Sequence, residues 1–359
     1  AFFETDFQES KEFMQQLPFY SYGISVLTLV FGGYILYIGK KKTYTHSRKE
    51  YLLTLTITVV GVALTVYRPI ARSKEYGGFQ WELTRTAPIA FYVSIYNNVQ
   101  LYHQMREELN RGIEGTPSWQ ITSINPKYIN YVMVIGESVR RDYMSLYGFP
   151  LENSSFLKEV KGTVIDGYTA TAPNTTTALL RMFLQMKGDD FVYENNLISL
   201  AKQAGFTTYW FSNQGSIGNW NMPIAKIGYL SDHKVFTKKG DSGSMNFYDT
   251  ALLPVLERHL KEKSNNPRLF VLHIMGSHPY FPERLEHTIH YDYYNRNLSA
   301  YLQTLEQTDA FLKQVYQLLK AQGEPFSLLY FSDHGLTSQD RSSPTFATLN
   351  HADTKPNKG

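Results

Sequence analysis

Hydrophobic residues follow two different patterns along the 359-residue chain, one in residues 1–75 and another from residue 129 onward. Near the N-terminus, residues 19–39 carry no charged side chain, and a second uncharged run covers residues 51–67. A helix of about 20 apolar residues is long enough to span a bilayer. We therefore predict a transmembrane helical hairpin within residues 1–75. The alternative is a pair of helices buried in a soluble protein.

The loop between these two runs is basic, with three lysines at 40–42 followed by Arg48 and Lys49. Basic residues mark the cytoplasmic side of a membrane protein. The loop is therefore expected in the cytoplasm, and everything after Arg68 on the opposite side. The chain opens without a methionine or a signal peptide and closes in a turn-like stretch, so we expect it to be cut from a longer, multi-pass protein.

Residues 76–120 carry apolar and aromatic side chains at helical spacing, among them Trp81, Tyr92, Tyr96 and Tyr102. Tryptophan and tyrosine favour the headgroup region, where one end of the ring is apolar and the other is wet. We expect an amphipathic and linker segment that rests at the membrane surface. A helix packed on the following domain is the alternative.

In residues 121–359, short β-branched or aromatic runs alternate with longer helical patterns. The expected strands are residues 128–136, 162–169, 206–212, 268–276 and 326–335. The expected helices are residues 175–187, 195–204, 248–263 and 296–322. This alternation predicts an α/β domain with a mainly parallel central sheet flanked by helices. From the charge pattern, the domain should lie outside the cytoplasm.

Composition excludes several classes of function. The 35 basic and 32 acidic residues give a net charge of +3, which lacks the excess of positive charge typical of nucleic-acid binding, so no nucleic-acid partner is expected. The chain contains no cysteine, which excludes a disulfide framework, a cysteine-ligated zinc site and a thiol nucleophile.

Polar side chains follow three of the predicted strands. Glu137 comes directly after the first strand, His278 after the fourth, and Asp333 and His334 end the last, while His351 stands in a later loop. Ligands of α/β sheets collect beyond the carboxyl ends of the strands, and mixed carboxylate and imidazole ligands suit Zn²⁺ or Mn²⁺. We therefore predict a metal site. Taken singly, the same residues could cap a helix, form hydrogen bonds in the core or face solvent.

Thr175 stands at a hydroxyl-rich helix start, after Pro173 and Asn174. The first N–H groups of a helix have no partner within it and can bind an anion. A threonine hydroxyl is a weak nucleophile, but a metal ion can stabilise its alkoxide while the helix N–H groups receive phosphoryl charge. The pattern favours phosphoryl transfer. Thr176 and Thr177 remain alternative nucleophiles, and a simple helix cap is the plainer alternative.

Five motifs stand in order along the chain: VIGESVRRDYMSLYGFP, the threonine-rich helix start, VLHIMGSHP, YFSDHG and NHAD. Together they resemble the membrane-anchored phosphoethanolamine transferases of the alkaline phosphatase and sulfatase superfamily, from about Tyr131 to the end of the chain. The resemblance implies the α/β fold of that superfamily in a periplasmic domain, preceded by transmembrane helices of the bacterial inner membrane. Because it lacks cysteine, the sequence resembles the cysteine-poor relatives that act on the lipopolysaccharide core or other envelope acceptors more than the disulfide-rich enzymes that modify lipid A.

The resemblance also implies a zinc site and a reaction. The implied ligands of one zinc ion are Glu137, Thr175, Asp333 and His334, with Thr175 as the nucleophile. His278 and His351 would steady the transferred group or bind a second metal. Phosphatidylethanolamine would be the donor, a covalent threonine intermediate would form, and lipopolysaccharide core or lipid A would be the acceptor. The anchor would hold the domain close to the membrane lipids that supply the donor.

Three other functions compete with this interpretation. A glycerol-phosphate transferase of the lipoteichoic acid synthase type would use similar metal chemistry on phosphatidylglycerol. A sulfatase would need a cysteine or serine in a formylglycine motif, which is missing here. A non-enzymatic envelope-binding protein would keep the fold without needing a metal.

Overall fold

The computed structural model describes residues 30, 32–34, 37, 47–74, 78–79, 83, 87–217, 221–238, 248–338 and 349–350. The chain divides into two compact units, one within Asp6–Gln104 and the other built on Met105–Gly359. The first unit contains the apolar helix, and the second carries the sheet and the predicted chemistry.

Helix α3, Arg48–Ala71, is the one helix among the described residues that is long and apolar enough to cross a membrane. It begins at a capping box, in which the Ser47 hydroxyl accepts from the N–H of Glu50 and the Glu50 carboxylate accepts from the N–H of Ser47. The predicted run 51–67 lies inside α3, and its side chains are almost all exposed. The predicted run 19–39 lies largely outside the described residues. The hairpin and its orientation therefore stay predictions.

Helix α4, Ala87–Arg111, occupies much of the predicted amphipathic segment. Trp81 and the side chains of Tyr92 and Tyr102 lie outside what the structure describes, and Tyr96 is exposed. An exposed tyrosine agrees equally with a helix at the membrane surface and with one in water. Placement of this segment at the membrane stays a prediction.

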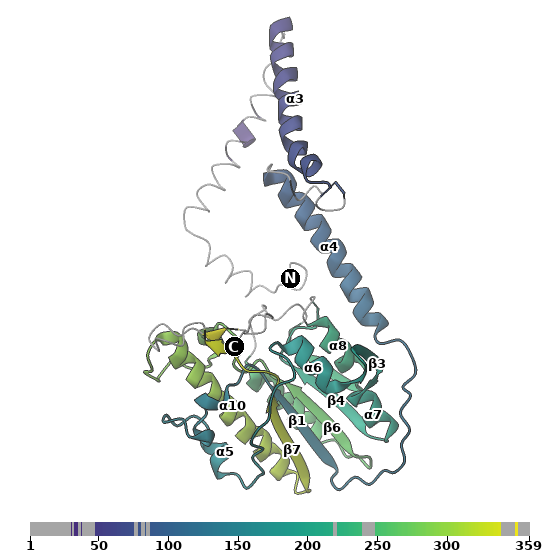
Figure 1. Cartoon of the computed structure of the whole chain (residues 1–359), viewed down its shortest axis with the longest axis vertical. Helices are drawn as coiled ribbons and strands as arrows, with labels where there is room; N and C mark the ends of the chain where they lie inside the picture. The colour runs from purple at the N-terminus through teal and green to yellow at the C-terminus, as the bar shows by residue number, and fades with distance from the viewer. Residues whose placement is uncertain are drawn as a thin grey trace. The chain divides into compact units, whose positions relative to one another are not determined.

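Within the described residues, five strands form one sheet in the order β5-β4-β6-β1-β7 (Figure 1). Their bounds are β1 Asn130–Gly136, β4 Thr207–Ser212, β5 His233–Phe236, β6 Arg268–His273 and β7 Phe326–Ser332. Every neighbouring pair is parallel, so the predicted mainly parallel sheet is confirmed. Gly136 pairs with Ser332, which brings the carboxyl ends of β1 and β7 side by side.

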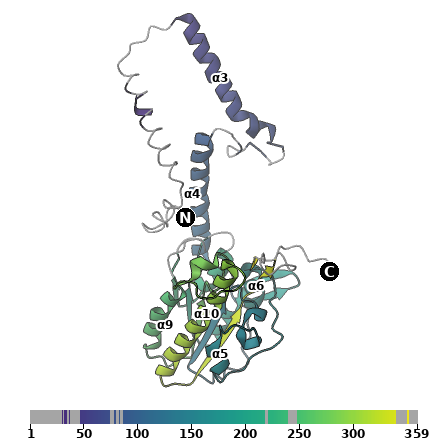
Figure 2. The same cartoon turned by 90° about the vertical axis from the view of Figure 1, so that its left-hand side faces the viewer.

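Helices cover both faces of this sheet (Figures 1 and 2). One face packs against α5 (Ser155–Glu159), α9 (Leu252–Leu260) and α10 (Arg296–Ala321), and the other against α6 (Thr175–Phe183), α7 (Leu197–Gln203) and α8 (Met222–Tyr229). Side chains alternate along each strand: Tyr209 and Phe211 face the first layer, and Trp210 between them faces the second. Because helices cover both faces, the centres of the inner strands are apolar, as at residues 209–211 and 270–272, while polar residues stand at strand ends and on the edge strand β5.

Two expected elements differ from the structure. Residues 162–169, predicted as a strand, form an irregular loop in which Val164 is 49% and Ile165 63% exposed, so that prediction was wrong. The helix expected over 175–187 ends at Phe183, because β2 (Leu184–Lys187) pairs antiparallel with β3 (Asp190–Asn196). The short elements α8 and β5 were missed. The remaining elements are η2 Arg141–Tyr143, η3 Ser145–Tyr147, η4 Asp249–Ala251, η5 Phe281–Arg284, β8 Thr337–Ser338 and β9 Leu349–Asn350.

Candidate metal centre

The strand ends bring three ionisable side chains together in the interior. Glu137 follows β1, and Asp333 and His334 follow β7. The backbone N–H of Asp333 donates to the carbonyl of Gly136 at 3.1 Å. All three are at most 1% exposed. One ligand atom from each lies within 4.8 Å of the other two. Strand pairing thus joins residues almost 200 positions apart into one cluster.

His334 presents one ring nitrogen to both carboxylates. Its Nδ1 lies 2.6 Å from the carbonyl oxygen of Gly335, which can only accept, so Nδ1 carries the proton. The opposite nitrogen, Nε2, lies 3.2 Å from Glu137 Oε1 and 3.5 Å from Asp333 Oδ2. An outer hydrogen bond of this kind orients a histidine whose other nitrogen binds a metal.

Thr175 points its hydroxyl at the same cluster. It is the first residue of α6, whose N-cap Asn174 accepts from the N–H of Thr177 at 2.9 Å. Thr175 Oγ1 lies 3.0 Å from Glu137 Oε2 and 3.2 Å from His334 Nε2. The structure therefore brings Glu137, Thr175, Asp333 and His334 together, although the four come from the ends of three separate elements.

The backbone around Glu137 is held in an uncommon conformation. Ser138 has φ of 59°, in the left-handed region, and its N–H donates to Asp333 Oδ1 at 3.1 Å. The buried hydroxyl of Tyr301 donates to the carbonyl of Ser138 and accepts from the N–H of Arg140. Such backbone strain persists only where surrounding contacts fix it. These contacts set the direction in which the Glu137 carboxylate points.

Asp249, which the sequence analysis missed, fixes the neighbouring loop. Its buried carboxylate accepts from the N–H groups of Met275 and Gly276 at 2.7 and 2.9 Å and from the Asn213 side chain at 2.8 Å. This loop follows β6 and leads to His278. Nothing in the local pattern distinguished Asp249, because it stands at the start of an ordinary amphipathic helix.

The ionisation of the cluster is strongly coupled. Burial alone would raise the pKa of Glu137, but the hydrogen bond and charge of His334 hold that pKa well below its usual range. Burial and the charge of Glu137 raise the pKa of Asp333 well above its ordinary value. Burial opposes a charged imidazole, yet the bond to Glu137 raises the pKa of His334 to about 9. Without a metal, protons therefore balance the buried carboxylates.

The donor set fits a divalent cation. Two carboxylates, one imidazole and one hydroxyl supply the oxygen and nitrogen ligands that zinc accepts. Asp333 Oδ2 is buried, and among the described residues it has no hydrogen-bond partner. A buried carboxylate oxygen left without a donor is costly unless a cation binds it.

His278 and His351 are the two other histidines predicted to take part in the site. His278 is half-buried and follows Ser277, whose N–H donates to the carbonyl of Glu137 at 3.1 Å, so it lies in the loop that contacts the cluster. His351 lies outside the described residues. The part that either histidine plays in the reaction stays a prediction.

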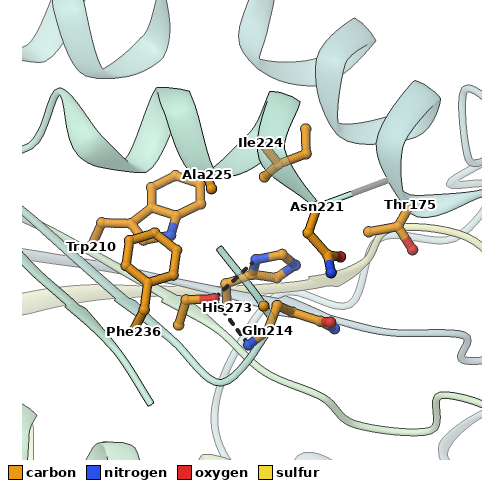
Figure 3. A pocket seen from close by; sticks show the side chains of 10 residues that line it. Thr175, Trp210, Gln214, Asn221, Ile224, Ala225, Phe236 and His273 are labelled. Atoms are coloured by element: carbon orange, nitrogen blue, oxygen red, sulfur yellow. Dashed lines mark hydrogen bonds between the residues drawn. The ribbon is translucent and has the colours of Figure 1, made fainter. Parts of the chain in front are cut away.

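A pocket opens beside Thr175 (Figure 3). Its empty volume is about 260 Å³, part of it open to solvent, and its walls come from the ends of β4, β5 and β6 and from the start of α8. Thr175 lies at one end, the rings of Trp210 and Phe236 close the other, and His273 and Asn221 stand between. Burial lowers the pKa of His273 to about 4, so its ring is neutral. The sequence analysis did not anticipate this pocket.

Comparison with known proteins identifies the family. A family model described as Sulfatase matches residues 129–357. Phosphoethanolamine transferase OpgE of Escherichia coli is 33% identical over 344 residues, covering 95% of this chain and 64% of that protein. A provisionally named phosphoethanolamine transferase of Haemophilus influenzae is 34% identical over 352 residues, covering 94% of this chain and 68% of that protein. The chain thus spans about two thirds of the length of these relatives.

A solved structure shares the fold. The C-terminal periplasmic domain of EcEptC from Escherichia coli, in complex with Zn, aligns with a TM-score of 0.55 at 23% identity, covering 66% of this chain and 72% of that one. The sulfatase-like α/β fold expected from the sequence is therefore confirmed. Fold, family model and relatives agree, and the chain belongs to the sulfatase family and, within it, to the phosphoethanolamine transferases.

Proposed function

We propose that the protein is a zinc-dependent enzyme that moves phosphoethanolamine from phosphatidylethanolamine to an acceptor in the bacterial envelope. One observation carries this proposal: the Thr175 hydroxyl, at the start of α6, lies 3.0 Å from Glu137 and 3.2 Å from His334 within a buried Glu-Asp-His cluster. A hydroxyl nucleophile at a helix N-terminus and beside a metal site suits phosphoryl transfer.

Glu137, Asp333 and His334 would hold the zinc, with Thr175 as the fourth ligand. When bound, zinc lowers the pKa of a coordinated hydroxyl and withdraws charge from a phosphoryl oxygen. The first N–H groups of α6 donate to the other phosphoryl oxygens. The related EcEptC domain was solved with Zn, which agrees with this choice of metal.

The first half of the reaction forms a bond from Thr175 Oγ1 to phosphorus and breaks the bond from phosphorus to the diacylglycerol oxygen. The hydroxyl proton of Thr175 ends, in net balance, on the released diacylglycerol, and His278 is the group we assign to deliver a proton to that oxygen. In the second half, the oxygen of an acceptor hydroxyl or protonated phosphate forms a bond to the same phosphorus, the bond from phosphorus to Thr175 Oγ1 breaks, and the acceptor's proton ends, in net balance, on Thr175. The double displacement predicts ping-pong kinetics.

The acceptor and the location belong to the same proposal. The donor is a membrane lipid, so an anchored domain meets it at a high effective concentration. Helix α3 supports such an anchor, and we place the catalytic domain on the periplasmic face of the inner membrane. We propose an envelope glycan as the acceptor class, with lipopolysaccharide core and lipid A as the first candidates and a soluble periplasmic glucan as a third.

Mass spectrometry of the zinc-loaded enzyme after incubation with phosphatidylethanolamine tests this function. A phosphoethanolamine adduct is expected on Thr175. It should disappear in Thr175→Ala, with a loss of transfer of about 10³-fold or more, because the nucleophile itself is removed. Thr177→Ala is the matched control, since it removes a hydroxyl from the same helical turn and should keep the adduct.

The other outcomes each change one part of the proposal. An adduct on Thr176 would move the nucleophile by one residue. Zinc bound but phosphatidylethanolamine uncleaved would contradict the donor, and a glycerol-phosphate adduct from phosphatidylglycerol would favour the lipoteichoic acid synthase type. A protein that binds no zinc would favour the envelope-binding alternative.

A further inference from the structure

The pocket beside Thr175 has walls that the reaction described so far does not use. It extends from the nucleophile to the rings of Trp210 and Phe236 (Figure 3), and it is not lined by Glu137, Asp333 or His334. Among the described residues that line it, none is charged at neutral pH. A cavity that begins at the nucleophile and is lined by none of the other three proposed zinc ligands is positioned for the part of a substrate that does not react.

His273 is one of two described lining residues with a buried polar atom that has no hydrogen-bond partner among the described residues; the other is Trp210, whose indole nitrogen is a donor. His273 is 4% exposed, and the atom without a partner is its Nε2. Its Nδ1 lies 3.5 Å from the hydroxyl of Ser212, which also accepts from the N–H of Gln214 (Figure 3). When Nδ1 donates to Ser212, the lone pair of Nε2 is left to accept from a group in the pocket. Buried polar atoms without partners are rare in native proteins, and a binding site is one reason for them.

The far end of the pocket suits a cation. The rings of Trp210 and Phe236 close the end opposite Thr175 (Figure 3). Trp210 is fully buried with Gly228 against its ring, so the partly buried Phe236 is the ring that can offer a face to a ligand. The faces of aromatic rings attract ammonium groups, most strongly where water is excluded. In the phosphoethanolamine headgroup only two carbons separate the phosphate ester oxygen from the amino nitrogen. Once phosphorus is at Thr175, the amino group has to lie in a space that borders this residue.

We propose that this pocket is the subsite for the aminoethyl arm of the donor headgroup, with His273 Nε2 accepting a hydrogen bond from the ammonium and Phe236 contributing its ring face. The inference rests on the proposed function, because it presumes phosphoethanolamine on Thr175. It goes further in assigning the choice between ethanolamine and other headgroups to residues outside the metal centre. A glycerol arm carries no charge and gains nothing from the aromatic end.

Two donors that differ only in the arm test the subsite. The zinc-loaded enzyme is assayed for covalent adduct and diacylglycerol release with phosphatidylethanolamine and with phosphatidylmethanol, in which a methyl group replaces the arm. For His273→Leu, kcat/KM with phosphatidylethanolamine should fall about ten-fold, the effect of losing one hydrogen bond to a charged group. With phosphatidylmethanol the variant and the parent should react equally.

A second variant covers the case in which His273→Leu does not fold. Phe236→Leu lies in a partly buried position and keeps an apolar side chain, and it should lower kcat/KM for phosphatidylethanolamine about three-fold through the loss of the ring face. His259→Leu is the matched control, because His259 is a buried histidine that packs against Tyr209 and Phe211 on the opposite face of the sheet. It should leave the ratio between the two donors unchanged.

The outcomes separate this proposal from the function on which it rests. If His273→Leu and Phe236→Leu lower the rates with both donors equally, or change neither, the pocket does not bind the arm and the proposal is wrong. If the unmodified enzyme binds zinc but makes no adduct from phosphatidylethanolamine, the proposed function itself fails. With phosphatidylglycerol as a third donor, a variant that lowers only the rate with that lipid would assign the pocket to a glycerol arm and overturn the choice of ligand.

Discussion

Gly276 is the residue at which a single added carbon should disturb the metal centre most. It lies in the left-handed region with φ of 45°, and a Cβ built there would meet the backbone nitrogen of Glu137 at 3.2 Å and its Cβ and carbonyl oxygen at 3.4 Å. The loop cannot simply move away, because Asp249 holds the Gly276 N–H at 2.9 Å and the Ser277 N–H donates to the Glu137 carbonyl at 3.1 Å. The strain of Gly276→Ala therefore falls on Glu137.

The free energy of unfolding lost in Gly276→Ala has two parts. A left-handed alanine costs about 1–2 kcal/mol relative to glycine. Crowding against a fixed backbone adds about 1–2 kcal/mol more. The control Gly205→Ala has φ of 79° and nothing within 4 Å of the added carbon, so it incurs only the first part. Displacement of Glu137 should in addition weaken zinc binding about 10–100-fold, as changes next to metal ligands do.

Two measurements on the full protein in detergent check this reasoning. Thermal unfolding followed by fluorescence should give Gly276→Ala a midpoint about 2–8 °C below that of Gly205→Ala, from the extra 1–2 kcal/mol. Competition with a chelator should show weaker zinc binding only for Gly276→Ala. Equal midpoints and equal zinc affinities for the two variants would refute the argument that this loop supports Glu137.

Three further predictions follow from the same site. Because the pKa of His334 is raised to about 9, zinc has to displace a proton from this histidine. Zinc affinity measured by chelator competition should therefore rise with pH up to about 9 and then level off. An affinity independent of pH would contradict the assignment of His334 as a zinc ligand. The raised pKa also makes the stability of the zinc-free protein depend on pH. The contribution of His334 is fully present below its unfolded pKa of about 6.5 and is lost as the pH rises through about 9. The thermal midpoint should therefore fall over this range for the zinc-free protein only. Asn174→Ala removes the acceptor for the Thr177 N–H and should cost about 1 kcal/mol of folding free energy, with a slower adduct rate on Thr175; an unchanged midpoint and rate would show that the cap does not position the nucleophile.

The cluster could be expected from the sequence because its chemistry sits at strand ends. Glu137 and the Asp333-His334 pair each follow an apolar run, and parallel strands place such residues on one edge of the sheet. The order of the strands in the sheet could not be predicted from the sequence. Only the structure shows that β1 and β7 are neighbours although nearly 190 residues separate them. Residues 162–169 illustrate the opposite error, since the pattern of Val164 and Ile165 matches a strand but no partner strand pairs with it.

The pocket was beyond sequence analysis for a different reason. Its walls come from the ends of β4, β5 and β6 and from α8, and two of these elements were missed: β5 has only four residues, two of them polar, and α8 makes only about two helical turns. Its residue types are ordinary ones for a protein core. His273 is distinguished only by a ring nitrogen that lacks a partner, which is a property of the folded chain.

The buried charges themselves argue for a metal-dependent activity. Removing two carboxylates and an imidazole from water costs several kcal/mol per charged group, and apolar residues of similar size would stabilise a binding scaffold at least as well. Protons on His334 and Asp333 offset part of that cost in the zinc-free state, and a cation that replaces them offsets it while leaving a ligand position for the Thr175 hydroxyl. A non-enzymatic protein would have no reason to keep this arrangement, because its fold depends on the strands and helices around the cluster. The energetic cost of the cluster is explained by the chemistry that it makes possible.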